Sequence, residues 1–165
     1  MPDLKKLSAD AIPGALEKAE RYRLLNEAAE AESICLDVLA TEPGNQRALI
    51  TLLLAMTDRF SKGYGVSDTQ ARELLAQIKG DYEKAYYSGI VAERRAKALL
   101  GRGAPGCAHL AYEGFHEAMH WFEKAEAVRP SGNDDALLRW NTCARMIERN
   151  NLTARDEERV EPVLE

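Results

Sequence analysis

The chain has 165 residues, a length that suits one domain with a hydrophobic core of its own. Its net charge of -5 argues against a duplex nucleic acid as partner, and no apolar run is long enough to span a bilayer. The three cysteines, Cys35, Cys107 and Cys143, are scattered and odd in number, which indicates reduced thiols in a cytoplasmic protein rather than a disulfide framework.

Helical spacing dominates the sequence. Apolar residues recur three and four positions apart, and alternating patterns of the strand type are nearly absent. We therefore expect an all-α fold. The predicted helices cover about 13–25, 27–39, 46–60, 68–80, 82–100, 107–128 and 134–150.

Turn and cap residues separate these helices. Pro13 suits the first turn of a helix. The residues expected to cap the following helix are Asn26, Asn45, Asp81 and Asn133. A capping-box pattern at 67–70 opens the fourth helix, and the glycine-rich stretches 61–66 and 101–106 are predicted loops. Residues 1–150 form the expected domain, and the charged tail 151–165 is either a frayed arm or a short docking segment.

One packing pattern occurs twice. In each copy a proline ends a helix, and small and large apolar residues precede that proline at matching offsets. The two sets are Ala31, Cys35 and Val38 before Pro43, and Ala118, Phe122 and Ala125 before Pro130. A small residue at such a position lets two helices approach closely, so the pattern predicts paired helices.

These residues resemble the tetratricopeptide repeat family, whose unit is a pair of antiparallel helices of about 34 residues. Ala19 and Tyr22 stand where that family has a small residue and an aromatic. The resemblance spans roughly 12–147, but the second repeat lacks the closing proline and the third carries a glycine-rich insertion. It implies about three antiparallel hairpins stacked as a short right-handed superhelix, with the seventh helix as a cap. An irregular helical bundle is the alternative.

The resemblance further implies that the first helix of each hairpin lines a concave groove that binds a peptide or a partner protein. Register transfer, with Gly89 taken as the small residue of the third repeat, gives the residues of this groove. The expected partner-binding residues are Glu20, Arg23, Arg47, Asp58, Tyr86 and Arg94, and the neighbouring apolar positions are Leu16, Ile50, Leu54 and Ile90. The alternative is that some of these side chains are buried between helices.

A catalytic-looking motif lies at 116–120, where His116, Glu117 and His120 match the H-E-x-x-H pattern of zinc peptidases. A metal-dependent hydrolase is therefore the competing hypothesis. Against it, the motif contains Ala118, which is expected to face the paired helix, so both histidines should point outward. Glu113, His116 and His120 remain a weak surface candidate for a metal, and we predict no catalytic residues and no cofactor.

The favoured interpretation is a scaffold or adaptor that binds a protein or peptide partner, with no nucleic-acid or membrane partner. Self-assembly into a homo-oligomer through an exposed end of the array is a further alternative. The run 93–95 is predicted to be a solvated helix face, with a place in the groove as the other option. Trp121 and Trp140 are expected to pack between helices.

Overall fold

The computed structural model describes residues 1–62 and 68–156, and within these ranges the chain contains α- and 3-10 helices and no strand. The expected all-α class is confirmed. The α-helices are α1 (Ile12–Leu24), α2 (Ala28–Thr41), α3 (Gln46–Asp58), α4 (Asp68–Gln77), α5 (Asp81–Arg102), α6 (Cys107–Ala127) and α7 (Asp135–Arg149). The 3-10 helices are η1 (Ala9–Ala11) and η2 (Phe60–Lys62).

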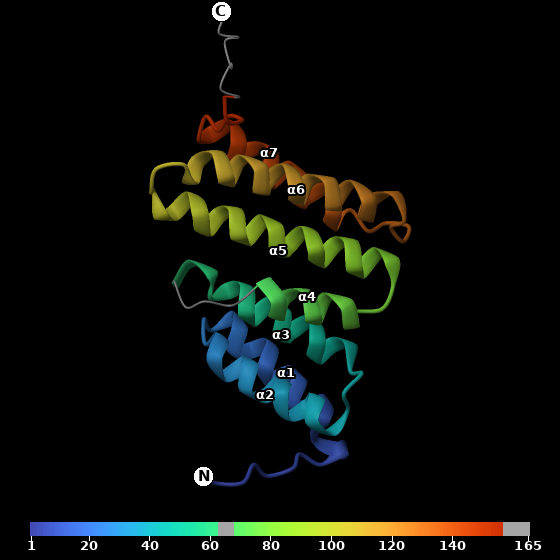
Figure 1. Cartoon of the computed structure of the whole chain (residues 1–165). Helices are drawn as coiled ribbons and strands as arrows, with labels where there is room; N and C mark the ends of the chain where they lie inside the picture. The colour runs from blue at the N-terminus through green and yellow to red at the C-terminus, as the bar shows by residue number, and fades with distance from the viewer. Residues whose placement is uncertain (63–67, 157–165) are drawn as a thin grey trace, which may run out of the picture.

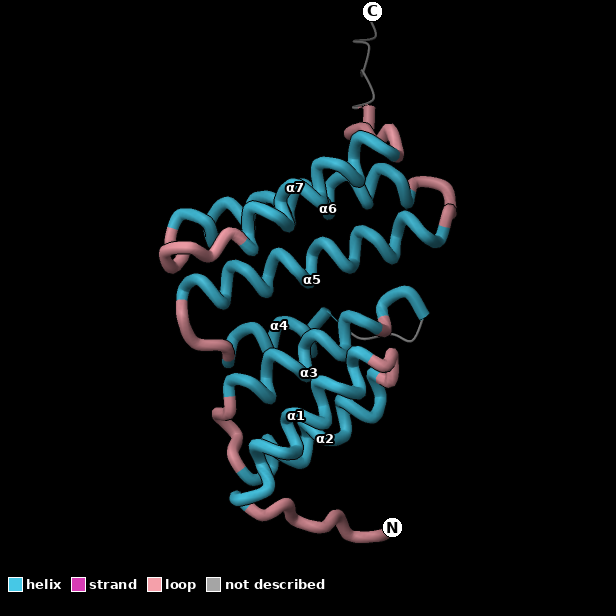
Figure 2. Tube along the Cα trace, turned by 180° about the vertical axis from the view of Figure 1, so that it is seen from behind, coloured by secondary structure: helices cyan, strands magenta, loops and turns pink. Residues whose placement is uncertain are grey.

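The helices stack in chain order from the N-terminus at one end to α7 at the other (Figure 1). α1 packs on α2, α2 on α3, α5 on α6 and α6 on α7. α3 also contacts both α1 and α5, so these three alternate helices are neighbours (Figure 2). This neighbourhood brings together side chains that lie far apart in the sequence.

Of the predicted caps, Asn45 is confirmed, because its Oδ1 accepts a hydrogen bond of 2.9 Å from the backbone N–H of Ala48. Two others are displaced by one residue. Asp81 is the first residue of α5, with Gly80 as its N-cap, and there its carboxylate is favourable for the helix dipole. Asp134 is the N-cap of α7, and Asn133 instead accepts a hydrogen bond from the N–H of Asp135.

The prediction for Asn26 is wrong. This residue does not cap α2 but ends α1 in the left-handed conformation, with φ of 62°. The Asn26 N–H donates to Arg23 O and the Glu27 N–H donates to Tyr22 O, which is the hydrogen-bonding pattern of a Schellman turn. Asparagine suits both ends of a helix because it tolerates left-handed backbone as well as capping.

The glycine-rich loop is shorter than predicted. α5 continues through Gly101 and Arg102 and ends at Gly103, whose φ of 62° terminates the helix. The other predicted loop begins as η2 at 60–62, and its remainder at 63–66 lies outside the described residues. Ser67 of the predicted capping box also lies outside them.

The small residues of the repeated pattern are buried as expected. Ala31 and Ala118 are both 0% exposed. Gly89 on α5 allows α5 and α6 to approach each other closely, because a Cβ at position 89 would lie 2.5 Å from Cε1 of Phe122 on α6. The apolar face of α6 is fully buried and consists of Ala111, Phe115, Ala118, Phe122 and Ala125.

α5 joins the two halves of the hydrophobic core. Val91 packs with the residues of α1–α4, whereas Ile90 and Ala92 pack with those of α6 and α7. The half-buried Tyr87 contacts both clusters. α5 is therefore the element through which the N-terminal and C-terminal halves are held together.

The start of the predicted tail packs against this core. Asn151 has a φ of 49°, and the N–H of Leu152 donates to Ile147 O at 3.0 Å. The turn places Leu152 in the α5–α7 cluster, where it is 8% exposed. Among the described residues, no helix has the length and apolar content needed to cross a membrane.

Candidate functional site

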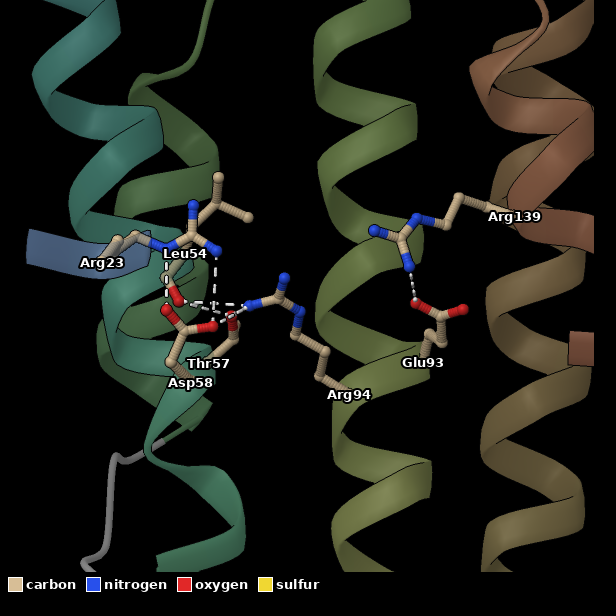
Figure 3. A network of polar contacts seen from close by, with 7 residues as sticks. All are labelled: Arg23, Leu54, Thr57, Asp58, Glu93, Arg94 and Arg139. Atoms are coloured by element: carbon tan, nitrogen blue, oxygen red, sulfur yellow. Dashed lines mark hydrogen bonds and ion pairs between the residues drawn. The ribbon is translucent and has the colours of Figure 1, made fainter. Parts of the chain in front are cut away.

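Three of the predicted groove residues meet although they come from three different helices. Arg23 on α1 and Arg94 on α5 reach Asp58 on α3 from opposite sides (Figure 3). Nε of Arg23 lies 2.7 Å from Oδ2 of Asp58, and Nη1 of Arg94 lies 2.5 Å from Oδ1. One carboxylate therefore links α1, α3 and α5.

Arg94 makes further contacts with α3. Its Nη1 also donates to Oγ1 of Thr57 at 2.7 Å and to the carbonyl oxygen of Leu54 at 3.3 Å. The side chain is 20% exposed, and burial lowers the pKa of the guanidinium, as do the charges of Arg23 and Arg139, although Asp58 opposes this. Arg94 thus lies in a partly desolvated position where Asp58 and two further guanidinium groups act on its charge.

Glu20 and Arg47 form a second ion pair between α1 and α3. The geometry is bidentate, with Nε to Oε1 at 2.6 Å and Nη2 to Oε2 at 2.8 Å. The hydrogen bond from Arg47 lowers the pKa of the Glu20 carboxyl. Nearly half of each side chain stays exposed, so this pair lies at the surface.

Tyr86 differs from the other predicted groove residues because its ring takes part in core packing. It stacks on Tyr82 with a centroid distance of 5.7 Å and meets Tyr87 edge-on at 5.1 Å. It also lies 5.9 Å from the ring of Phe122 on α6. Tyr86 is half-buried and packs against the α5–α7 cluster.

Glu93 was expected on a solvated helix face, and this prediction is wrong: the residue is 0% exposed. Its Oε2 lies 3.3 Å from Nη1 of Arg139 on α7, and its Oε1 lies 3.7 Å from Nζ of Lys97. The thiol of Cys143 on α7 donates to the same carboxylate at 3.7 Å. A buried ion pair therefore joins α5 to α7.

The sequence does contain a signal for the position of Glu93. Residues 82, 86, 89, 93, 96 and 100 alternate spacings of four and three, which places them on one helix stripe. Every other member of that stripe is apolar, aromatic or glycine. A carboxylate inside such a stripe predicts a buried group with a basic partner on another helix, which here is Arg139.

The histidine motif lies on the outside of α6. His116 and His120 are exposed, as is Glu113, and the His116 ring lies 4.4 Å from that of Tyr112. His109 contacts the chain after α7 through Nδ1, 3.0 Å from the carbonyl oxygen of Thr153. Within the described part of the chain, no three His, Cys, Asp or Glu side chains are grouped so that they could hold a metal ion.

Comparisons of the chain with protein-family models, with curated proteins and with solved structures give no match. The candidate site therefore depends on the geometry itself. That geometry consists of charged side chains on α1, α3, α5 and α7 that pair across helix boundaries. The pairs are Glu20–Arg47, Arg23–Asp58, Asp58–Arg94 and Glu93–Arg139.

Proposed function

We propose that this chain is a protein–protein interaction scaffold built from helical hairpins similar to tetratricopeptide repeats. Its binding surface lies on α1, α3 and α5, and the residues expected to contact a partner are Glu20, Arg23, Arg47, Asp58, Tyr86 and Arg94. It binds a segment of another protein and performs no chemistry of its own.

The observation that carries this proposal is the meeting of Arg23, Asp58 and Arg94. Transfer of a repeat register selected these residues from three separate helices, and both arginine side chains lie within hydrogen-bonding distance of the Asp58 carboxylate. Such contacts require every second helix to be a spatial neighbour, which is how stacked hairpins are arranged. Because α1, α3 and α5 lie next to one another, their polar side chains form a row that a bound segment can contact.

The pairing of these residues affects how the surface should be tested. Reversing the charge of Arg47 alone would place two carboxylates together, because Glu20 lies 2.6 Å away. A swap of both residues, Glu20→Arg with Arg47→Glu, keeps an ion pair and changes the charge pattern that a partner meets. Because the pair is exposed, the swap should change stability little.

A matched control exists on the other side of α3. Arg59, the C-cap of α3, pairs with Glu32 on α2 at 2.6 Å, and both side chains are about one-third exposed. The control variant is Glu32→Arg with Arg59→Glu. It changes the same kinds of residue by the same amounts on the α2 side of the molecule.

The experiment is affinity capture from the native host with the wild-type chain and both swap variants. We expect the wild type and the Glu32/Arg59 swap to recover the same discrete partner, and the Glu20/Arg47 swap to lose it while remaining folded by circular dichroism. Equal recovery of the partner by all three proteins would contradict the assignment of the binding surface to α1, α3 and α5. Loss of the partner only in the Glu32/Arg59 swap would show that the binding surface lies on α2 instead.

A further inference from the structure

An excess of positive charge is concentrated on one part of the proposed binding surface and on the adjoining part of α7. We refer to six residues there as the arginine cluster: Arg23, Asp58, Glu93, Arg94, Lys97 and Arg139. Each of its two carboxylates is shared by two cations, so the cluster has four basic groups for two acidic ones. The chain as a whole has the opposite sign, with a net charge of -5.

The two halves of the cluster lie close together. Glu93 and Arg94 are consecutive residues of α5, and their side chains extend toward different neighbouring helices (Figure 3). Arg94 meets Asp58 on α3, whereas Glu93 meets Arg139 on α7. The charge of Arg139 acts on Arg94, so the guanidinium groups share one electrostatic environment.

The basic groups of the cluster remain accessible. The side chains of Arg23 and Arg94 are each 20% exposed, that of Arg139 is 35% exposed and that of Lys97 is 37% exposed. Glu93, in contrast, is completely buried. The Asp58 side chain is 24% exposed, so solvent and ligands meet four partly exposed cations and one carboxylate. The partial burial of these groups weakens screening by salt.

We infer that the partner segment is acidic, and that carboxylates of that segment bind the arginine cluster. This inference rests on the proposed function and specifies the chemistry of its partner. A guanidinium donates through several N–H groups, so Arg23 and Arg94 can each keep Asp58 and bind a second carboxylate. The two carboxylates of the cluster neutralise only two of its four cations, and an acidic segment supplies the remaining negative charge. A segment bound across α1, α3, α5 and α7 would place its carboxylates next to these cations.

The inference makes opposite predictions for two residues that touch each other. Arg94→Gln removes a cation, so an anionic ligand should bind about tenfold more weakly. Asp58→Asn removes the carboxylate that competes for both arginines, so the same ligand should bind more tightly, by about threefold or more. A purely structural role for this ion pair would make both substitutions neutral or harmful to binding.

The experiment measures binding of a fluorescent oligoglutamate peptide to the full chain by anisotropy at low and at physiological salt. Oligolysine and oligothymidylate of matched length serve as comparison probes. We expect oligoglutamate to bind, with an affinity that falls as salt rises. Arg59→Gln and Glu32→Gln are the matched controls, because they change net charge by the same amounts at the α2–α3 pair. Each should alter the affinity less than twofold.

Circular dichroism monitors folding of every variant. If Asp58→Asn or Arg94→Gln fails to fold, Lys97→Gln replaces it: this partly exposed residue can be lost while Arg139 still pairs with Glu93, and about threefold weaker binding is expected. No binding of oligoglutamate, or equal effects of cluster and control variants, overturns the inference. Preferential binding of oligothymidylate would also overturn the inference, because the ligand would then be a nucleic acid and not an acidic peptide. If the Glu20/Arg47 swap abolishes partner capture while oligoglutamate does not bind, the inference fails and the proposed function stands.

Discussion

Glu93 on α5 and Arg139 on α7 form an ion pair in which the carboxylate has no solvent exposure and lies 3.3 Å from the guanidinium. A buried carboxylate is costly unless it is paired, so α7 packs where it can supply the cation. Burial lowers the pKa of Arg139, but the Glu93 charge, together with contributions from Tyr86 and Cys143, outweighs this effect and the net pKa is raised. The pair thus ties the last helix to the centre of the stack.

We predict that Arg139→Gln lowers the free energy of unfolding by about 2 kcal/mol, because it leaves the Glu93 charge with only the more distant Lys97. Urea denaturation followed by circular dichroism measures the change. The double variant Glu93→Gln with Arg139→Gln should recover part of the loss, since no unpaired charge stays buried. A double variant that is less stable than Arg139→Gln would contradict this explanation.

Gly89 and Phe122 provide a test of the close approach between α5 and α6. Gly89→Ala should destabilise the fold by about 1–2 kcal/mol, because the added Cβ would lie 2.5 Å from the Phe122 ring and overpacking outweighs the gain in helix propensity. Thermal and urea unfolding measure the effect.

Gly101→Ala is the matched control for this substitution. Gly101 lies on the same helix and has nothing within 4 Å of an added Cβ. We expect it to stabilise the chain by about 0.5 kcal/mol. Equal effects of the two substitutions would show that α5 and α6 do not pack through Gly89.

The buried thiols predict a loss of stability in alkali. Burial raises the pKa of both Cys35 and Cys143 from about 9 to about 12, with nearby carboxylates acting in the same direction. Below pH 9 the folded and the unfolded chain both keep the two thiol protons, so the thiols do not make the free energy of unfolding depend on pH. Between pH 9 and 12 the unfolded chain loses protons that the folded chain retains, and stability falls by about 1.4 kcal/mol per pH unit for each thiol.

A double variant, Cys35→Ala with Cys143→Ala, isolates this contribution, because it retains Tyr82 and Tyr87, whose pKa values burial also raises. Urea unfolding between pH 8 and about 10.5 should give a shallower decline for the variant. Parallel curves for the two proteins would mean that neither thiol is protected in the folded state.

Patterns that depend on local spacing were predictable from the sequence. The positions of the helices, the burial of Ala31 and Ala118 and the outward placement of His116 and His120 follow from helical periodicity. Asn26 was assigned to the wrong helix end because asparagine favours both ends. The loop after α5 was predicted too long because Gly101 is tolerated inside a helix that is anchored by its other residues.

Features that depend on which helices are neighbours were predictable only through the resemblance. Register transfer selected Arg23, Asp58 and Arg94 as members of one surface, but periodicity alone does not show that these side chains pair with one another. Glu93 was missed because neighbouring charges at 94 and 95 suggested a solvated face. Its partner Arg139 is 46 residues away, beyond the reach of any local pattern.

Site-specific photo-crosslinking in the native host tests most directly whether the surface of α1, α3 and α5 binds a protein. A photoreactive amino acid replaces Glu17 on α1 in one variant, an exposed residue outside the proposed contact set whose charge acts on Arg47, and Leu36 on α2 in the other, which is 52% exposed. We predict that the probe at position 17 crosslinks one discrete partner and that the probe at position 36 does not. A partner crosslinked from position 36 alone would contradict the proposed binding surface.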